Sequence, residues 1–208
     1  MSILSIKWIF AKGLKRILNP AALHDCNKHG TAKVGPGSEL TAVSVGRYSY
    51  LGSRCFAVNA EIGGFCSIAD NCRIGGAAHA MDYVSTSPVF LRGKNILKKN
   101  FAPLEPVHAP KTVVEHDVWL GAGCQIKSGV TVGTGAVIGM GSIVTHDVPP
   151  YEVWAGNPAR KIRDRFDEET KQKLLASKWW ELEDDKLATV AEKFDDPSGL
   201  LDLIERII

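Results

Sequence analysis

The feature that most constrains this 208-residue sequence is a period of six between residues 114 and 144. Aliphatic side chains recur at every sixth position, and a glycine directly follows several of them. The aliphatic positions are Val114, Leu120, Ile126, Val132, Ile138 and Val144. A spacing of six cannot keep to one face of an α-helix, whereas it suits a solenoid in which short strands and corners alternate. The pattern therefore predicts stacked coils whose aliphatic side chains point inward.

Small side chains occupy the position four residues after each aliphatic residue, as expected where a side chain points into a crowded corner. In this block they are Cys124, Val130, Ala136 and Ser142. An earlier block follows the same rule with aliphatic Val45, Leu51, Ile62, Ile68 and Ile74 and with Ser49, Cys55, Cys66, Cys72 and Ala78 at the corners. Four of the five cysteines are therefore predicted to be buried, reduced and structural, while Cys26 falls outside the pattern.

The period disappears between residues 77 and 111, where several prolines and polar residues replace it. A long irregular insertion in a compact fold is usually functional. We therefore expect an excursion loop that leaves the solenoid and returns. A five-residue step between Leu40 and Val45 predicts, in addition, that one corner of the first block is a residue shorter.

The two ends of the chain have helical patterns. Residues 1–18 have the pattern of a basic amphipathic helix. This helix is expected to cap the open end of the solenoid or, as a less favoured alternative, to lie on an anionic membrane surface. The predicted organisation is an N-terminal helix or cap (1–30), a β-helical domain (31–160) and a C-terminal helical cap (161–208). The C-terminal helices are expected to cover the last coil, with Trp179 and Trp180 in their core.

These repeats and several local motifs resemble the hexapeptide-repeat acyltransferases, and within them the xenobiotic acetyltransferases of the chloramphenicol and streptogramin type. The motifs are Val118-Trp-Leu-Gly121, Gly156-Asn-Pro-Ala-Arg160, Val45-Gly-Arg-Tyr-Ser-Tyr50, Ile62-Gly-Gly-Phe-Cys-Ser-Ile68, His79 followed by Ser85-Thr86, and Trp179-Trp180. The resemblance implies a mainly β fold, a left-handed parallel β-helix with an excursion loop, assembled as a homotrimer whose active sites lie between subunits. The expected reaction is acetyl-CoA-dependent O-acetylation of a small-molecule hydroxyl.

His79 is the candidate general base, because it opens the excursion loop and carries the family resemblance there. Histidine changes charge near neutral pH, which suits removal of a proton from an acceptor. The resemblance assigns the acceptor pocket to Tyr48, Tyr50, Ser85 and Thr86. The sequence does not name the acceptor, which is either a drug such as chloramphenicol or a streptogramin, or a sugar of a polysaccharide.

Coenzyme A has a long pantetheine arm and a phosphate-rich end, which exposed backbone groups and cations can bind. The resemblance places cofactor contacts at Trp119, Ala122, Met140, Thr145, His146, Arg160 and Arg163. Met140 departs from the smaller residue common in relatives and is expected to narrow the channel. A solvated basic surface is the simpler explanation for the cations between residues 160 and 165.

Composition and charge leave three alternatives open. The formal charge of +2 gives no reason to expect nucleic acid as a partner, and the pattern predicts a cytoplasmic protein without a metal. An N-acetyltransferase acting on a nucleotide-linked sugar would use similar donor machinery. A metal hydratase of the γ-carbonic anhydrase type would need three converging histidines, and His79, His108 and His116 are poorly spaced for this. A non-catalytic solenoid scaffold would not bind coenzyme A.

Overall fold

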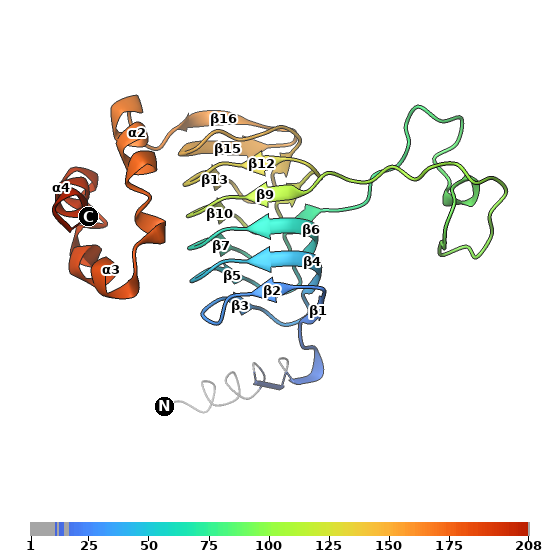
Figure 1. Ribbon diagram of the computed structural model, residues 1–208, viewed down its shortest axis with the longest axis horizontal. Coiled ribbons are helices and arrows are strands. Elements are labelled where there is room, and N and C mark those ends of the chain that lie inside the picture. The colour runs from blue at the N-terminus through green and yellow to red at the C-terminus, as the bar shows by residue number, and fades with distance from the viewer. Residues whose placement is uncertain (1–10, 12, 15–16, 208) are drawn as a thin grey trace.

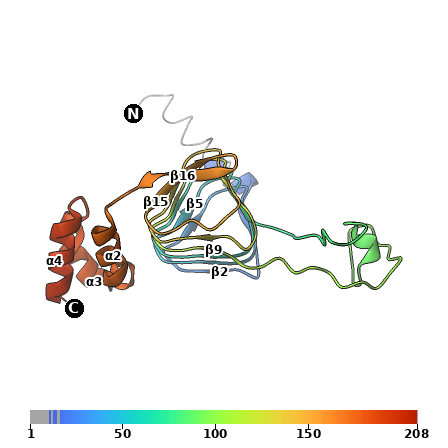
Figure 2. The ribbon, with the colours of Figure 1, turned by 90° about the horizontal axis from the view of Figure 1, so that it is seen from above.

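The computed structural model describes residues 11, 13–14 and 17–207. Their main body is a parallel β-helix whose coils stack along one axis (Figure 1). Viewed from above, each coil crosses three flat faces and turns at three corners (Figure 2). The predicted combination of β-helix, excursion loop and C-terminal helices is confirmed. The expected N-terminal helix over residues 1–18 lies almost wholly outside the described residues.

Short parallel strands stack on each of the three faces. Face one contains β1 (Ala22–His24), the first halves of β4 (Glu39–Val45) and β6 (Phe56–Ile62), β8 (Arg73–Gly75), β11 (Gln125–Ile126) and β14 (Ile143–Val144). Face two contains β2 (Asn27–Lys28), the second halves of β4 and β6, β9 (Thr112–Val114) and β12 (Thr131–Val132). Face three contains β3 (Lys33–Val34), β5 (Tyr50–Leu51), β7 (Ser67–Ile68), β10 (Trp119–Leu120), β13 (Val137–Ile138), β15 (Glu152–Gly156) and the antiparallel β16 (Ala159–Asp164).

The inward aliphatic residues form one continuous core, as the period predicted. Leu120 and Ile138 are fully buried and lie directly above one another on face three. Four cysteines occupy inward corners and are free and buried, which confirms the prediction for them. The Cys72 thiol lies 3.2 Å from the Gly121 carbonyl of the next coil, so the corner cysteines also bond the stack together. Burial raises the pKa of the Cys66 thiol to about 12.

The corner between faces one and two is short in the early coils. β4 and β6 bend through it at single residues with positive φ, Ala42 (54°) and Asn59 (49°). Side chains one coil apart are therefore 17 residues apart in this block, as for Ser38 and Cys55. This explains the five-residue step in the sequence, and it confirms the shorter corner.

The excursion loop replaces this same corner in the next coil. Val58 pairs with Gly75 and Ala60 pairs with Thr112, so Gly76 faces Asn59 and residues 77–111 are the insertion. We call this insertion the arm. It extends away from the solenoid (Figures 1 and 2) and contains the short 3₁₀ helix η1 (Pro88–Phe90).

The C-terminal residues form a helical unit of α2 (Glu168–Ser177), η2 (Trp179–Glu181), α3 (Asp184–Val190), η3 (Ala191–Lys193) and α4 (Pro197–Ile207). Trp179 and Trp180 lie in its core, as predicted. The unit packs along the side of the solenoid, across several coils, and not over the last coil as expected (Figure 1). It is held there by contacts between its two tryptophans and corner residues of three successive coils, namely Arg47, Phe65 and His116. Among the described residues, no helix is long and apolar enough to cross a membrane.

Candidate active site

The His79 imidazole is oriented by a backbone carbonyl of the arm. Its Nδ1 lies 2.9 Å from the Thr86 carbonyl oxygen. A carbonyl oxygen only accepts hydrogen bonds, so Nδ1 must carry the proton and donate it. The second ring nitrogen, Nε2, then has a free lone pair. The side chain is exposed. The arm therefore presents a histidine in the tautomer that a general base needs.

The other expected acceptor residues of the arm, Ser85 and Thr86, belong to the turn that folds back onto this histidine. Ser85 accepts a hydrogen bond from the Ser87 backbone N–H at 3.1 Å, and Thr86 provides the carbonyl that orients His79. Both residues therefore shape the local turn. Their position beside His79 is compatible with contact to an acceptor.

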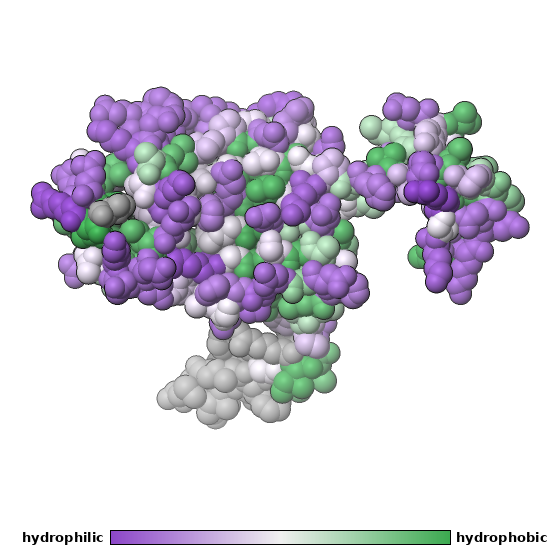
Figure 3. All heavy atoms as spheres, in the orientation of Figure 1, coloured by the Kyte–Doolittle hydropathy of each residue, from purple (hydrophilic) through white to green (hydrophobic). Residues whose placement is uncertain are grey.

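The arm has few contacts with its own solenoid. Asn59 donates to the Ala109 carbonyl at 3.0 Å, and Lys111 lies 3.7 Å from Glu61, both at the returning end of the arm. Its outer part folds on itself, with Phe90 and Phe101 packed at 6.0 Å between ring centroids. Large apolar side chains nevertheless stay exposed on it (Figure 3), namely Met81, Val84, Ile96, Leu97, Phe101, Leu104 and Val107.

The expected cofactor residue Trp119 lies on the outside of face three, where it is 54% exposed. Strand pairing aligns it with a series of residues that we call the outward column. From the first coil to the last, the column consists of Lys33, Tyr50, Ser67, Trp119, Val137, Val153 and Arg163. Since paired residues point to the same side of a sheet, the fold brings Tyr50, Trp119 and Arg163 to one surface.

Ala122 and Met140 lie one above the other at the corner that follows face three. Gly141 donates its N–H to the Ala122 carbonyl at 2.8 Å, and the Met140 side chain is 80% exposed. A Cβ on Gly121 would lie 2.5 Å from the Met140 nitrogen, so the glycine allows the two coils to approach closely. The Met140 side chain therefore projects beside the outward column.

Two arginines end this surface. Arg160 pairs with Ala155 and Arg163 with Val153 on the hairpin of β15 and β16. Within the described part of the chain, Arg160 and Arg163 donate only to backbone carbonyls, whereas the neighbouring Lys161 and Arg165 have carboxylate partners at 2.7 Å and 3.3 Å. Arg160 and Arg163 are therefore the cations of this strand that remain available to an anion.

Thr145 and His146 lie at a different corner from these residues. They follow β14 and therefore occupy the corner between faces one and two, in line with the origin of the arm. The Thr145 hydroxyl lies 2.9 Å from His146 Nδ1. The seven expected cofactor residues thus divide between face three with its following corner and the corner of the arm.

Tyr48 and Tyr50 are separated by the fold although they are near neighbours in sequence. Tyr48 has a positive φ of 58°, packs on Phe65 with ring centroids 5.3 Å apart, and donates its hydroxyl to Asp184. That hydrogen bond raises the pKa of the Tyr48 hydroxyl. Tyr48 therefore contacts the helical unit, while Tyr50 lies in the outward column.

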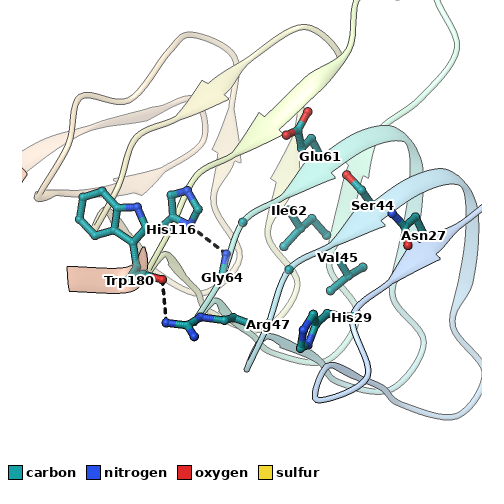
Figure 4. Close-up of a pocket in the computed structure, with 12 residues that line it drawn as sticks. Asn27, His29, Ser44, Val45, Arg47, Glu61, Ile62, Gly64, His116 and Trp180 are labelled. Carbon is teal, nitrogen blue, oxygen red and sulfur yellow. Dashed lines mark hydrogen bonds between the residues drawn. The ribbon is translucent and has the colours of Figure 1, made fainter. Parts of the chain in front are cut away.

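A groove of about 430 Å³ runs along face two beside the helical unit (Figure 4). Its lining includes Arg47, Glu61, His116 and Trp180. His116 stacks on Trp180 with centroids 5.2 Å apart, and its Nδ1 accepts the Gly64 N–H at 3.0 Å. Arg47 donates to the Trp180 carbonyl at 3.0 Å. His116 and Arg47 are thus engaged in docking the helical unit.

Sequence reasoning missed this docking role of His116 and Arg47, since a corner position alone does not reveal a partner so distant in sequence. The only local signal was the Trp179-Trp180 pair, which required a surface to pack on. Within the part of the chain that the structure describes, no three His, Cys, Asp or Glu side chains form a group able to hold a metal ion.

Known proteins resemble both the sequence and the fold. The family model for the bacterial transferase hexapeptide (six repeats) matches residues 111–146. A chloramphenicol acetyltransferase of Agrobacterium fabrum is 42% identical over 122 residues, which are 57% of this chain and 58% of that protein. A probable macrolide acetyltransferase of Lysinibacillus sphaericus is 32% identical over 161 residues, which are 76% of this chain and 87% of that protein. The match thus spans less than two thirds of the chloramphenicol acetyltransferase.

Two solved structures share the fold. A maltose O-acetyltransferase from Clostridium difficile superposes with a TM-score of 0.55 at 24% identity, over 80% of this chain and 90% of that one. A hexapeptide-repeat acetyltransferase from Vibrio cholerae in complex with acetyl coenzyme A gives a TM-score of 0.53 at 24% identity, over 74% and 76%. At this identity the similarity concerns the fold alone.

Proposed function

This chain belongs to the hexapeptide-repeat acetyltransferases, and we propose that it transfers an acetyl group from acetyl-CoA to a hydroxyl of a small-molecule acceptor. The observation that carries the proposal is the His79 tautomer. A proton on Nδ1, fixed by the Thr86 carbonyl at 2.9 Å, leaves Nε2 able to take the acceptor proton. The names of the chloramphenicol and macrolide acetyltransferases support a small-molecule acceptor.

In the proposed reaction His79 Nε2 removes the hydroxyl proton as the acceptor oxygen attacks the thioester carbonyl carbon. The carbon–sulfur bond then breaks, and His79 returns the proton to the departing sulfur. The products are the acetyl ester and free coenzyme A thiol. A positioned base of this kind contributes typically about 100- to 10,000-fold to the rate.

The outward column and the corner beside it are the proposed site for coenzyme A. Trp119, Ala122 and Met140 line the path of the pantetheine arm, and Arg160 and Arg163 bind its phosphates. The absence of carboxylate partners for these two arginines, among the described residues, supports the assignment. Thr145 and His146 contribute from the corner of the arm, and Tyr50 contacts the acceptor.

We propose that the site is completed by a second copy of the chain in a trimer. The arm that contains His79 extends away from its own solenoid (Figure 2), and its apolar side chains are exposed. Because exposed apolar area of this kind is favourably buried against a partner, the arm of one copy is expected to pack beside the outward column of the next.

The experiment measures release of free thiol from acetyl-CoA with chloramphenicol, a macrolide, a streptogramin and a panel of simple, amino and nucleotide-linked sugars. His79→Ala is expected to lose roughly 100- to 10,000-fold in turnover while acetyl-CoA binding stays within about twofold. His108→Ala on the same arm is the matched control and should keep wild-type turnover. Wild-type turnover in His79→Ala would contradict the assignment of the base. Thiol release only with amino sugars would favour N-acetylation.

A further inference from the structure

The arm and part of the helical unit carry opposite charges. The arm, residues 77–111, contains five basic and two acidic side chains, a net charge of +3. Residues 181–196 of the helical unit contain seven acidic and two basic side chains, a net charge of −5. We call this second segment the acidic edge. The whole chain has a formal charge of only +2, so its charges are segregated into separate regions.

Most of the basic charge of the arm lies in its outer lobe. Arg92 pairs with Glu105 at 2.7 Å. Three further lysines are exposed and, within the part of the chain that the structure describes, have no carboxylate partner. We call them the tip lysines, and they are Lys94, Lys98 and Lys99. Asn95 orders their turn, because it accepts the Leu97 N–H at 2.9 Å and donates to the Lys99 carbonyl at 3.0 Å. The lysines are therefore presented on an ordered backbone, which lowers the entropy lost on binding.

The acidic edge borders the corner that leads into face three. Asp184 accepts a hydrogen bond from the hydroxyl of Tyr48, two residues before the outward column in that coil. Phe194 lines a cavity of about 210 Å³ together with Asp117, two residues before Trp119. The acidic edge therefore lies at the start of face three, across at least the two coils that these contacts mark.

Several carboxylates of the acidic edge are available to an outside cation. Those that are exposed and have no cationic partner among the described residues are Glu181, Glu183, Asp185, Glu192 and Asp195. The carboxylates of α2 differ, since Glu168 and Glu169 pair with lysines of their own helix at 2.6 Å and 2.7 Å. Like charges gathered on one surface repel each other, and a cationic partner relieves that repulsion.

The arm and the acidic edge cannot meet within one chain. The arm leaves from the corner before face two, whereas the helical unit docks at the corner after it. The two extend from the solenoid in opposite directions (Figures 1 and 2). They nevertheless lie at the same level of the stack, because the arm returns into β9 and His116, just after β9, contacts the helical unit.

We propose that the tip lysines of one copy bind the acidic edge of the next copy, an inference that rests on the proposed trimer. A threefold rotation about an axis parallel to the stack turns the direction of face two in one copy into that of face three in its neighbour. The arm extends backward along the line of its own face two (Figure 2). It therefore runs backward along the neighbour's face three, beside the outward column, toward the acidic edge at the start of that face.

The test reverses the charges on each side and measures trimer dissociation by sedimentation over a dilution series at low salt. Lys98→Glu combined with Lys99→Glu should raise the dissociation midpoint concentration about tenfold, because attraction becomes repulsion. Asp185→Lys combined with Asp195→Lys should have a similar effect. The variant with all four substitutions should return to within about threefold of the wild type, since the signs are exchanged and the attraction is restored.

The matched control is Asp202→Lys combined with Glu205→Lys on α4. It reverses the same amount of charge outside the acidic edge and should leave the midpoint within about twofold of the wild type. A midpoint that does not respond to either reversal, or a fourfold variant no more stable than the double variants, would overturn the proposal.

Two further outcomes have distinct meanings. Binding of the full chain to vesicles of phosphatidylcholine and phosphatidylserine, lost in the Lys98→Glu and Lys99→Glu variant while trimer dissociation is unchanged, would assign the tip lysines to a membrane and overturn the contact. A wild-type protein that is monomeric at micromolar concentration would overturn the proposed trimer together with this contact. An intact trimer that is indifferent to the reversals would overturn this contact alone.

Discussion

The solenoid and the arm differ in where their contacts lie. In the solenoid each residue pairs with its counterpart one coil away, as Leu120 does with Ile138. The arm forms hydrogen bonds mainly within itself and keeps Val84 and Ile96 fully or almost fully exposed. The comparison indicates that contacts between coils stabilise the chain, whereas the arm contributes little to its stability.

The largest expected effect is a loss of acetyl transfer without a loss of stability when the arm is deleted. Deletion of residues 77–111 with Gly76→Asn would restore the one-residue corner that Asn59 forms in the preceding coil. We expect this variant to unfold within about 5 °C of the wild type, since ordinary coils are already built this way. Acetyl transfer should be abolished. Retained transfer, or loss of cooperative unfolding, would contradict the division of roles.

A core substitution tests the other side of the comparison. Ile138→Ala removes a fully buried side chain from the stack and should lower the free energy of unfolding by about 2–5 kcal/mol. Ile96→Ala is the matched control on the arm, where the side chain is 91% exposed, and its effect should stay within about 0.5 kcal/mol. Urea denaturation measures both. Equal effects of the two substitutions would refute the comparison.

Thiol labelling tests whether individual corners of the solenoid stay closed in the native protein. Cys66 is fully buried and its pKa is raised to about 12, so its thiol stays protonated and inaccessible at about pH 8. Only the half-buried Cys26 should react with a disulfide reagent in the native protein, and Cys26→Ser should remove that reaction. All five thiols should react in urea. Rapid native labelling of Cys26→Ser would show that the corners open.

The smallest expected effect concerns pH and the helical unit. Burial lowers the pKa of His116 below its usual 6.5 and outweighs the opposing charges of Glu115, Glu181 and Glu61. As the pH falls through about 6.5 the unfolded chain takes up this proton before the folded chain does, so stability is lost on acidification. His116→Gln should show a weaker loss between about pH 7 and 5. An unchanged pH dependence would place the acid sensitivity elsewhere.

The sequence predicts the solenoid well because its signal is local and repeated. Val132 and Ile138 both point inward because they occupy the same position of the six-residue repeat. Each corner cysteine likewise fills the same kind of small buried space. The location of the helical unit could not be predicted in this way. The contacts of Arg47 with Trp180 and of His116 with Gly64 join residues far apart in sequence and leave no periodic trace.

The candidate site shows the same limit. The repeat length aligns Tyr50, Trp119 and Arg163 on one face, which follows from strand pairing alone. The separation of Tyr48 from Tyr50 does not, because it depends on a positive φ at Tyr48 and on the partner Asp184. In the proposed trimer, the way His79 meets its substrates depends on a second chain, and one sequence carries no direct signal of that geometry.

The most direct test of a site shared between copies is complementation of two defective variants. His79→Ala and Arg163→Glu are each expected to be nearly inactive at limiting acetyl-CoA. Co-expressed with different tags and purified as mixed trimers, they should regain up to about a third of wild-type turnover, because one of the three sites in each mixed trimer then combines an intact His79 with a neighbour's intact Arg163. Mixed trimers that remain as inactive as the separate variants would show that His79 and Arg163 act within one chain, which contradicts the account.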